Sequence, residues 1–205
     1  SLILLLFLSL NQSITIDFRI DLLNKITENN IFNIFIVSFF FLVLVNGYNF
    51  IDGVNNLSSL NFLIILIFIY FILNDLKIYD LMNNILILIL AIFIFVIFNF
   101  FGKNFLGDGA IYGLSFFIGY ILIKISSMDE TISPYYFANL LWYPAFENLF
   151  TISRRNFTKV KNYLPDNEHL HQIVFKFFDK KKIFKKKYLN SSFVGIIINL
   201  FLLIL

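Results

Sequence analysis

The side chains best suited to chemistry stand in three short polar segments of an otherwise apolar chain. The first segment, residues 46–57, reads Asn-Gly-Tyr-Asn-Phe-Ile-Asp-Gly-Val-Asn-Asn-Leu. Asn46 and Asn49 are three residues apart and share one face of a helix, which Asp52 extends by another turn. A carboxylate and two carboxamides beside a long apolar run are costly unless they bind something. A polar helix end followed by an Asn/Gly turn explains the same residues about equally well.

The second segment, residues 105–109, reads Phe-Leu-Gly-Asp-Gly and lies between two apolar runs. Glycines on both sides of Asp108 let the backbone approach a ligand closely. A single carboxylate can bind Mg²⁺ when phosphate oxygens complete the octahedral coordination. Taken alone, these five residues fit an ordinary Gly-rich turn with a solvated Asp108 better than a metal site.

The third segment, residues 165–171, contains the only two histidines of the chain, His169 and His171. A His-x-His pair can bind a metal ion, relay protons or contact phosphate. Zinc is disfavoured because no third soft ligand stands near the pair. The chain has no cysteine, which also excludes disulfides and thiolate metal sites.

Basic residues surround these histidines. Arg154 and Arg155 lie upstream, and adjacent arginines suit bidentate recognition of phosphate. The alternative is a basic loop that faces anionic lipid headgroups. That alternative fits residues 180–187, where lysines and apolar residues show no pattern, better than it fits the histidines.

Composition identifies the class of protein that carries these segments. Hydrophobic residues make up 59% of the chain and charged residues 14%, and the mean hydropathy is +0.82. An ordinary globular domain has about 25% charged residues. A chain of 205 residues could not bury this much apolar surface away from water. We therefore expect an integral membrane protein and no nucleic-acid partner.

The apolar runs predict an all-α, polytopic transmembrane helix bundle, with residues 1–205 forming a single domain. A spanning helix needs roughly 20 apolar residues. The runs are apolar on all sides, as suits helices buried in lipid or in a bundle. The run at residues 1–10 is short, as expected of a truncated span, and the one at residues 136–150 is weakened by Pro144. Six or seven spans are predicted, at residues 1–10, 31–45, 61–73, 83–101, 110–125, 136–150 and 192–205.

Charge predicts how the bundle sits in the membrane. Of the 16 lysines and arginines, 11 fall between Arg154 and Lys187. By the positive-inside rule, residues 151–191 form a long, basic, cytoplasmic loop. Counting spans backwards, residues 102–109 and 49–59 also become cytoplasmic if residues 136–150 cross the membrane. The three polar segments are therefore predicted on one side.

Together the segments resemble the polyprenyl-phosphate N-acetylhexosamine-1-phosphate transferases. That family carries Asn-x-x-Asn-x-x-Asp-Gly, Phe-Leu-Gly-Asp and Pro-Asp-x-x-His-x-His in the order found here. It also has a Pro-x-x-Glu or Pro-x-x-Asp segment followed by an arginine pair, similar to Pro144 and Glu147 followed by Arg154 and Arg155. The resemblance covers residues 31 to 178.

The resemblance implies an enzyme that transfers a sugar-1-phosphate from a UDP-sugar to polyprenyl phosphate at the cytoplasmic face of the inner cell membrane. This is the first membrane step of a cell-envelope glycan, such as cell wall or lipopolysaccharide, and N-acetylglucosamine is the default sugar. A homodimer is compatible with it. The cofactor would be Mg²⁺, or Mn²⁺, held by Asp108. Catalytic roles would fall to Asp52, His169 and His171, and substrate binding to Asn46, Asn49, Asn55, Phe105, Arg154, Arg155 and Asp166.

The sequence departs from the family pattern in three places. The family's Asp-Asp pair is not found, and we expect it upstream of Ser1, so that this chain is the C-terminal portion of the enzyme. Asn55 and Asn56 stand where many members have Asp and Gly, and Gln172 replaces a third histidine.

Two other classes of protein remain open. A transporter or channel subunit would use Asp52 and Asp108 as ion sites and predicts acids in the middle of spans. A decayed, non-catalytic transferase is supported only by the missing Asp-Asp pair.

Overall fold

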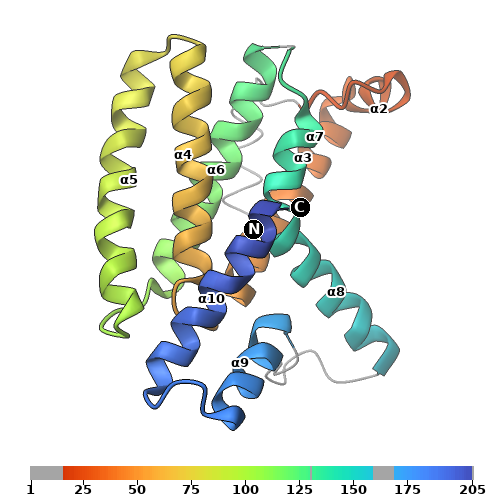
Figure 1. Ribbon diagram of the computed structural model, residues 1–205. Helices are drawn as coiled ribbons and strands as arrows, with labels where there is room; N and C mark the ends of the chain where they lie inside the picture. The colour runs from red at the N-terminus through yellow and green to blue at the C-terminus, as the bar shows by residue number, and fades with distance from the viewer. Residues whose placement is uncertain (1–15, 130, 159–168, 205) are drawn as a thin grey trace.

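The computed structural model describes residues 16–129, 131–158 and 169–204 (Figure 1). Within these residues every regular element is a helix. The helices are α2 (Asp21–Thr27), α3 (Asn30–Ile51), α4 (Leu57–Asp75), α5 (Tyr79–Phe100), α6 (Gly107–Met128), α7 (Pro134–Leu140), α8 (Trp142–Thr158), α9 (Leu170–Lys181) and α10 (Lys187–Ile204).

Five of the described helices, α3, α4, α5, α6 and α10, are long and apolar enough to cross a membrane. They have 18 to 22 residues each, which matches the thickness of a bilayer core. Each contains or overlaps one of the predicted runs, so the polytopic helix bundle is confirmed. Helix α3 continues to Ile51, beyond the apolar run, because Asn46 and Asn49 are compatible with helical backbone.

The single span predicted at residues 136–150 is wrong. The structure has two helices there, α7 and α8, which meet at Leu141. Pro134 begins α7, and Pro144 lies in the first turn of α8, where its missing N–H breaks no helical hydrogen bond. In Figure 1 the pair runs from the end of α6 to the opposite end of the bundle, with α8 leaning outward.

One predicted segment is not described, and another has more structure than predicted. The first predicted run, residues 1–10, lies outside the described residues. The loop predicted at residues 151–191 contains the end of α8, all of α9 and the start of α10, and its residues 159–168 also lie outside the described part. The prediction missed α9 because its apolar residues cover only one face, which produces no continuous apolar run.

Helix α3 is the element around which the site is built. It packs against α6 and α8, while α4 packs against α5 and α10. At Gly47 a Cβ atom would lie 2.1 Å from the carbonyl oxygen of Pro144, so only glycine lets α3 approach α8 this closely. The core between the helices contains Phe41, Tyr48 and Phe62, and the last two rings stack with centroids 4.2 Å apart.

Two buried amides, Asn99 of α5 and Asn199 of α10, hold the turn between α3 and α4. The N–H of Asn56 donates to Oδ1 of Asn99 at 2.6 Å. Nδ2 of Asn199 donates to the carbonyl oxygens of Asn56 and Leu57, at 3.3 and 2.9 Å. Asn56 has a φ of 62°, a left-handed conformation that asparagine tolerates. Nδ2 of Asn99 also donates to the carbonyl of Asn104 at 2.6 Å, which joins this turn to the loop before α6.

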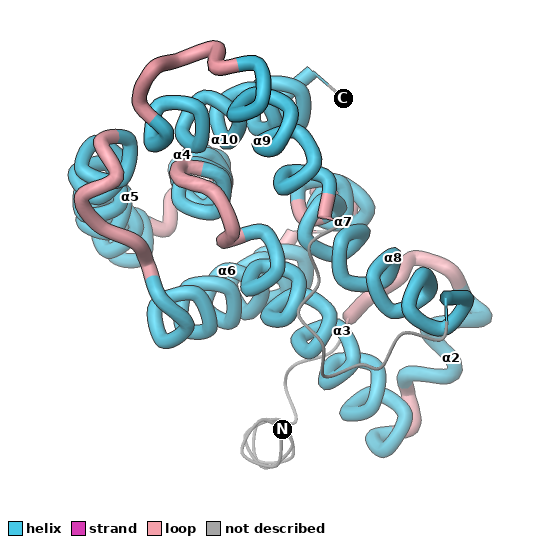
Figure 2. Tube along the Cα trace, turned by 90° about the horizontal axis from the view of Figure 1, so that it is seen from below, coloured by secondary structure: helices cyan, strands magenta, loops and turns pink. Residues whose placement is uncertain are grey.

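Figure 2 shows the end of the bundle at which the α3–α4 turn, the α5–α6 loop and α9 lie. The described parts of the three polar segments therefore share one end. The lysines at the end of α9 and the start of α10 lie at the same end (Figure 1).

Candidate active site

Asp52 ends α3 and is half-buried. Its Oδ1 accepts a hydrogen bond from the hydroxyl of Ser58, in the first turn of α4. Burial raises the pKa of Asp52 to about 6, and the nearby charge of Asp108 adds to this, while the Ser58 hydrogen bond opposes it. The Asp52 carboxyl therefore titrates close to neutral pH.

Asp108 lies in the first turn of α6 and is exposed. Its Oδ1 accepts a hydrogen bond from Nδ2 of Asn49 at 3.2 Å. This bond joins the first polar segment to the second across 59 residues of sequence. Asp52 and Asp108 both stand at ends of spanning helices, which disfavours the intramembrane ion sites of a transporter.

The carboxylate of Asp108 fits a magnesium ligand. It is an oxygen donor open to solvent, and its hydrogen bond to Asn49 leaves the second oxygen available. Among the described residues, no three His, Cys, Asp or Glu side chains gather closely enough to hold a metal ion by themselves. A bound Mg²⁺ would therefore take its other ligands from substrate phosphates and water, as this ion commonly does.

Two further predicted residues stand near these acids and are open to ligands. Asn46 is exposed one turn before Asn49 on α3. Phe105, two residues before the start of α6, is 84% exposed. A phenyl ring this exposed next to Asp108 is available to stack on a planar ligand.

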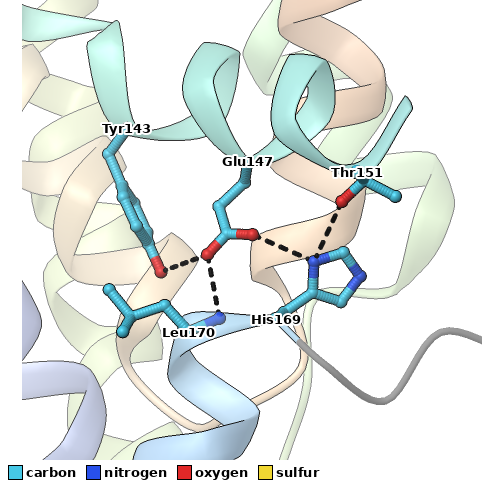
Figure 3. A network of polar contacts seen from close by, with 5 residues as sticks. All are labelled: Tyr143, Glu147, Thr151, His169 and Leu170. Atoms are coloured by element: carbon cyan, nitrogen blue, oxygen red, sulfur yellow. Dashed lines mark hydrogen bonds and ion pairs between the residues drawn. The ribbon is translucent and has the colours of Figure 1, made fainter. Parts of the chain in front are cut away.

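Glu147 of α8 is the centre of a buried polar network (Figure 3). It is 2% exposed. Its Oε1 accepts from the backbone N–H of Leu170 at 3.1 Å and from the hydroxyl of Tyr143 at 3.3 Å. Its Oε2 lies 3.0 Å from Nδ1 of His169, which also lies 3.4 Å from Oγ1 of Thr151. Tyr143, Glu147 and Thr151 are four residues apart, so one face of α8 meets the start of α9.

The two histidines lie in a stack of rings. The ring centroid of His169, which is 4% exposed, lies 5.2 Å from that of Phe50 and 5.5 Å from that of His171. His171 is 0% exposed, and neither of its ring nitrogens has a hydrogen-bond partner among the described residues. A Cβ atom at Gly53 would lie 2.6 Å from Nε2 of His171. His171 therefore lies directly against the residue that follows Asp52.

Burial lowers the pKa of His171 to about 4, and the charge of His169 adds to this, while Glu147 opposes it. The ring is therefore neutral at pH 7. Unsatisfied buried nitrogens are rare in proteins and need an explanation. A substrate phosphate or sugar hydroxyl that reaches the ring would supply the missing hydrogen bond.

One predicted site residue, Asn55, is turned away from this centre. The N–H of Asn55 donates to Oγ of Ser191 at 2.9 Å, and its amide Nδ2 donates to Oγ of Ser192 at 3.4 Å. The second of these bonds turns the side chain toward α10. Arg154 and Arg155 lie half-buried in the last turns of α8. Asp166 lies outside the described residues.

The network around Glu147 was only partly visible in the sequence. Glu147 is the only acid between Glu130 and Asp166, in a largely apolar stretch, and the arrangement with Tyr143 and Thr151 at four-residue intervals was a usable signal. Its pairing with His169 gave no local signal, because that contact joins two different helices.

Residues 1–126 of the chain match the family model described as Glycosyl transferase family 4. The match includes Asn49, Asp52 and Asp108 and ends before Glu147 and the histidines. No curated protein and no solved structure matches the chain.

Proposed function

The chain belongs to glycosyl transferase family 4, and on this basis we propose that it transfers N-acetylhexosamine-1-phosphate from a UDP-sugar to polyprenyl phosphate at the cytoplasmic face of the membrane. The family supports sugar-phosphate transfer to polyprenyl phosphate in general, and the five apolar helices indicate a multi-pass membrane protein. The proposal goes further than family membership in three respects: it specifies a UDP donor, an N-acetylhexosamine and the cytoplasmic side.

One observation carries the proposal: the polar segments meet at a single end of the bundle. Asn49 hydrogen-bonds Asp108 at 3.2 Å, and His171 lies against Gly53, next to Asp52. The lysines at the end of α9 and at the start of α10 lie at this end, which supports a cytoplasmic site. A lipid substrate could keep its tail in the bilayer while its phosphate reaches the site.

In the proposed reaction, an oxygen of the lipid phosphate attacks the sugar-side phosphorus of the UDP-sugar. The bond from that phosphorus to the bridging oxygen breaks, and UMP leaves with the bridging oxygen. Both reactants are anionic, so the site must align them and offset their charge. Mg²⁺ bound at Asp108 would offset charge on the donor diphosphate.

The side chains of the site would divide the remaining work. The pKa of Asp52, about 6, matches the second pKa of a phosphate monoester, which is also about 6, so Asp52 can accept the proton that the attacking phosphate loses. Asn46 and Asn49 would line the same pocket, and Phe105 would stack on the uracil ring. His171 would contact the diphosphate or the sugar, together with Arg154 and Arg155.

The test is transfer of label from radioactive UDP-N-acetylglucosamine to undecaprenyl phosphate by the purified protein in lipid nanodiscs with Mg²⁺. We expect labelled lipid together with release of UMP. Asp108→Asn removes the charged oxygen ligand and should lower transfer at least about 100-fold without unfolding the protein. Asp179→Asn is the matched control, because Asp179 is an exposed acid on α9 at the same end of the bundle.

Release of UDP instead of UMP would contradict sugar-phosphate transfer, because it indicates transfer of the sugar alone. Equal activity of the wild-type protein and Asp108→Asn would contradict the metal role of Asp108. Equal transfer from UDP-glucose would contradict selection of an N-acetylhexosamine.

A further inference from the structure

Glu147 and His169 have no assigned part in the reaction proposed above, although both are buried at the edge of the site. A buried carboxylate is costly unless hydrogen-bond donors surround it. Glu147 has donors at both of its oxygens: the N–H of Leu170 and the hydroxyl of Tyr143 at one, and His169 at the other. The arrangement therefore fixes the carboxylate in one orientation relative to α9.

This orientation determines which ring nitrogen of His169 carries the proton. An ionised carboxylate only accepts hydrogen bonds, so the bond at 3.0 Å requires a proton on Nδ1 of His169. In a neutral ring, Nε2 is then the unprotonated nitrogen. A carboxylate commonly sets the tautomer and orientation of a histidine in this way.

The network is not a nucleophile–histidine–acid triad. Such a triad needs the hydroxyl and the carboxylate at different ring nitrogens. Here Oγ1 of Thr151 and Oε2 of Glu147 both lie near Nδ1 of His169. The geometry therefore indicates that His169 is held in place and that Thr151 is not activated as a nucleophile.

The ring of His171 is positioned by stacking on the ring of His169. The ring planes of His169 and His171 differ by only 7°. Phe50 stacks on His169, so the ring of His169 lies between those of Phe50 and His171. Neither ring nitrogen of His171 has a hydrogen-bond partner among the described residues, so packing orients the ring. Its Nε2 edge rests on Gly53.

We propose that Glu147 is a positioning residue that fixes the Nδ1-protonated tautomer of His169, and that His169 in turn holds the ring of His171 against Gly53 as the substrate-contacting histidine. This division of labour rests on the proposed transferase function. The two histidines therefore differ in kind: His169 acts through another residue, and His171 meets the substrate.

The test uses ring nitrogen signals of ¹⁵N-histidine-labelled protein in detergent micelles, without substrate. The chain has only two histidines, so two ring systems appear, and His171→Asn assigns them. We expect His169 of the wild-type protein to carry its proton on Nδ1. This spectrum needs no variant of Glu147, so a variant that fails to fold does not remove the test.

Glu147→Gln should reverse the tautomer. The N–H of Leu170 can only donate, so the carboxamide oxygen should face Leu170 and the amide nitrogen should face His169. The amide then donates to Nδ1 and moves the ring proton to Nε2. Transfer should fall about 10–100-fold, as is typical when the partner that orients a functional histidine is lost.

Asn148→Ala is the matched control for damage to α8. Asn148 is the buried neighbour of Glu147, and its Nδ2 donates to the carbonyl of Val43 in α3 at 3.0 Å. Asn148→Ala should lower the thermal midpoint and leave both the tautomer and the turnover of the folded protein unchanged.

A wild-type His169 with an unprotonated Nδ1, or a tautomer that Glu147→Gln does not change, would overturn the proposal. A loss of turnover in Asn148→Ala equal to that in Glu147→Gln would also overturn it, because it would assign Glu147 a merely structural role. A wild-type protein with the expected tautomer but no transfer activity would support the positioning and contradict the proposed function instead.

Discussion

Replacing Gly53 with alanine tests how closely α9 must approach the end of α3. The backbone of Gly53 lies outside the left-handed region, so alanine meets no conformational penalty there. The added methyl group would lie 2.6 Å from Nε2 and 3.2 Å from Cδ2 of His171. Ordinary contacts of a Cβ atom begin at 3.4 Å, so the ring must move by about 0.8 Å, the difference between 3.4 and 2.6 Å.

This displacement sets the expected size of the effect. His171 is fully buried and stacked on His169, so its ring cannot rotate freely out of the way. An overpacked core typically costs about 1–3 kcal/mol of stability. A misplacement of about 1 Å in an active site can cost about 100-fold in rate. Gly53→Ala should therefore lower turnover by more than its loss of stability explains.

The assay is sugar-phosphate transfer to undecaprenyl phosphate, measured beside the thermal midpoint of the purified protein. Gly113→Ala is the control, because a Cβ atom at Gly113, within α6, meets no atom within 4 Å. Alanine in a helix interior is more stable than glycine by roughly 0.5–1 kcal/mol, so this control should keep its activity and its fold.

Two outcomes would refute this reasoning. Wild-type turnover in Gly53→Ala would show that the position of His171 does not matter to transfer. An equal loss of turnover in Gly113→Ala would show that any added methyl group disturbs the protein.

Two further predictions concern the frame around Asp52. Ser58→Ala removes a hydrogen bond that lowers the pKa of Asp52, so the acidic limb of the pH–rate profile, expected near pH 6, should move to higher pH. Asp52 is protonated below this pKa, so activity should fall as the pH decreases, and a shift to lower pH would contradict the assignment. Asn199→Leu leaves the carbonyls of Asn56 and Leu57 without their donor and should cost about 1–3 kcal/mol, measured by thermal unfolding against Asn84→Leu, a change at an exposed asparagine of α5.

The helices that cross the membrane were predictable because their apolar character is a local property of the chain. Asp52 and Asp108 stood out because each lies in a short polar segment beside long apolar runs. The break at Leu141 was harder to predict, because Pro144 is tolerated in the first turn of a new helix. Pro144 weakened the predicted span without indicating where the chain would bend.

The pairing of side chains was not predictable from one sequence. Asn49 and Asp108 are 59 residues apart, and Glu147 and His169 are 22 residues apart. Each pair depends on how two helices pack, which local patterns do not encode. Asn55 illustrates the same limit: the family resemblance assigned it to substrate binding, but the turn directs its amide toward Ser192.

The amides that hold the α3–α4 turn have a consequence for how the enzyme should respond to acid. Asn99 and Asn199 are carboxamides, which gain and lose no proton across the physiological range. The scaffold that carries Asp52 should thus keep its shape while the carboxyl itself titrates. The Asp52 carboxyl therefore responds to acidity, while the amides that support the turn do not. The pH–rate profile of transfer should then report the protonation of Asp52 and not unfolding of this turn.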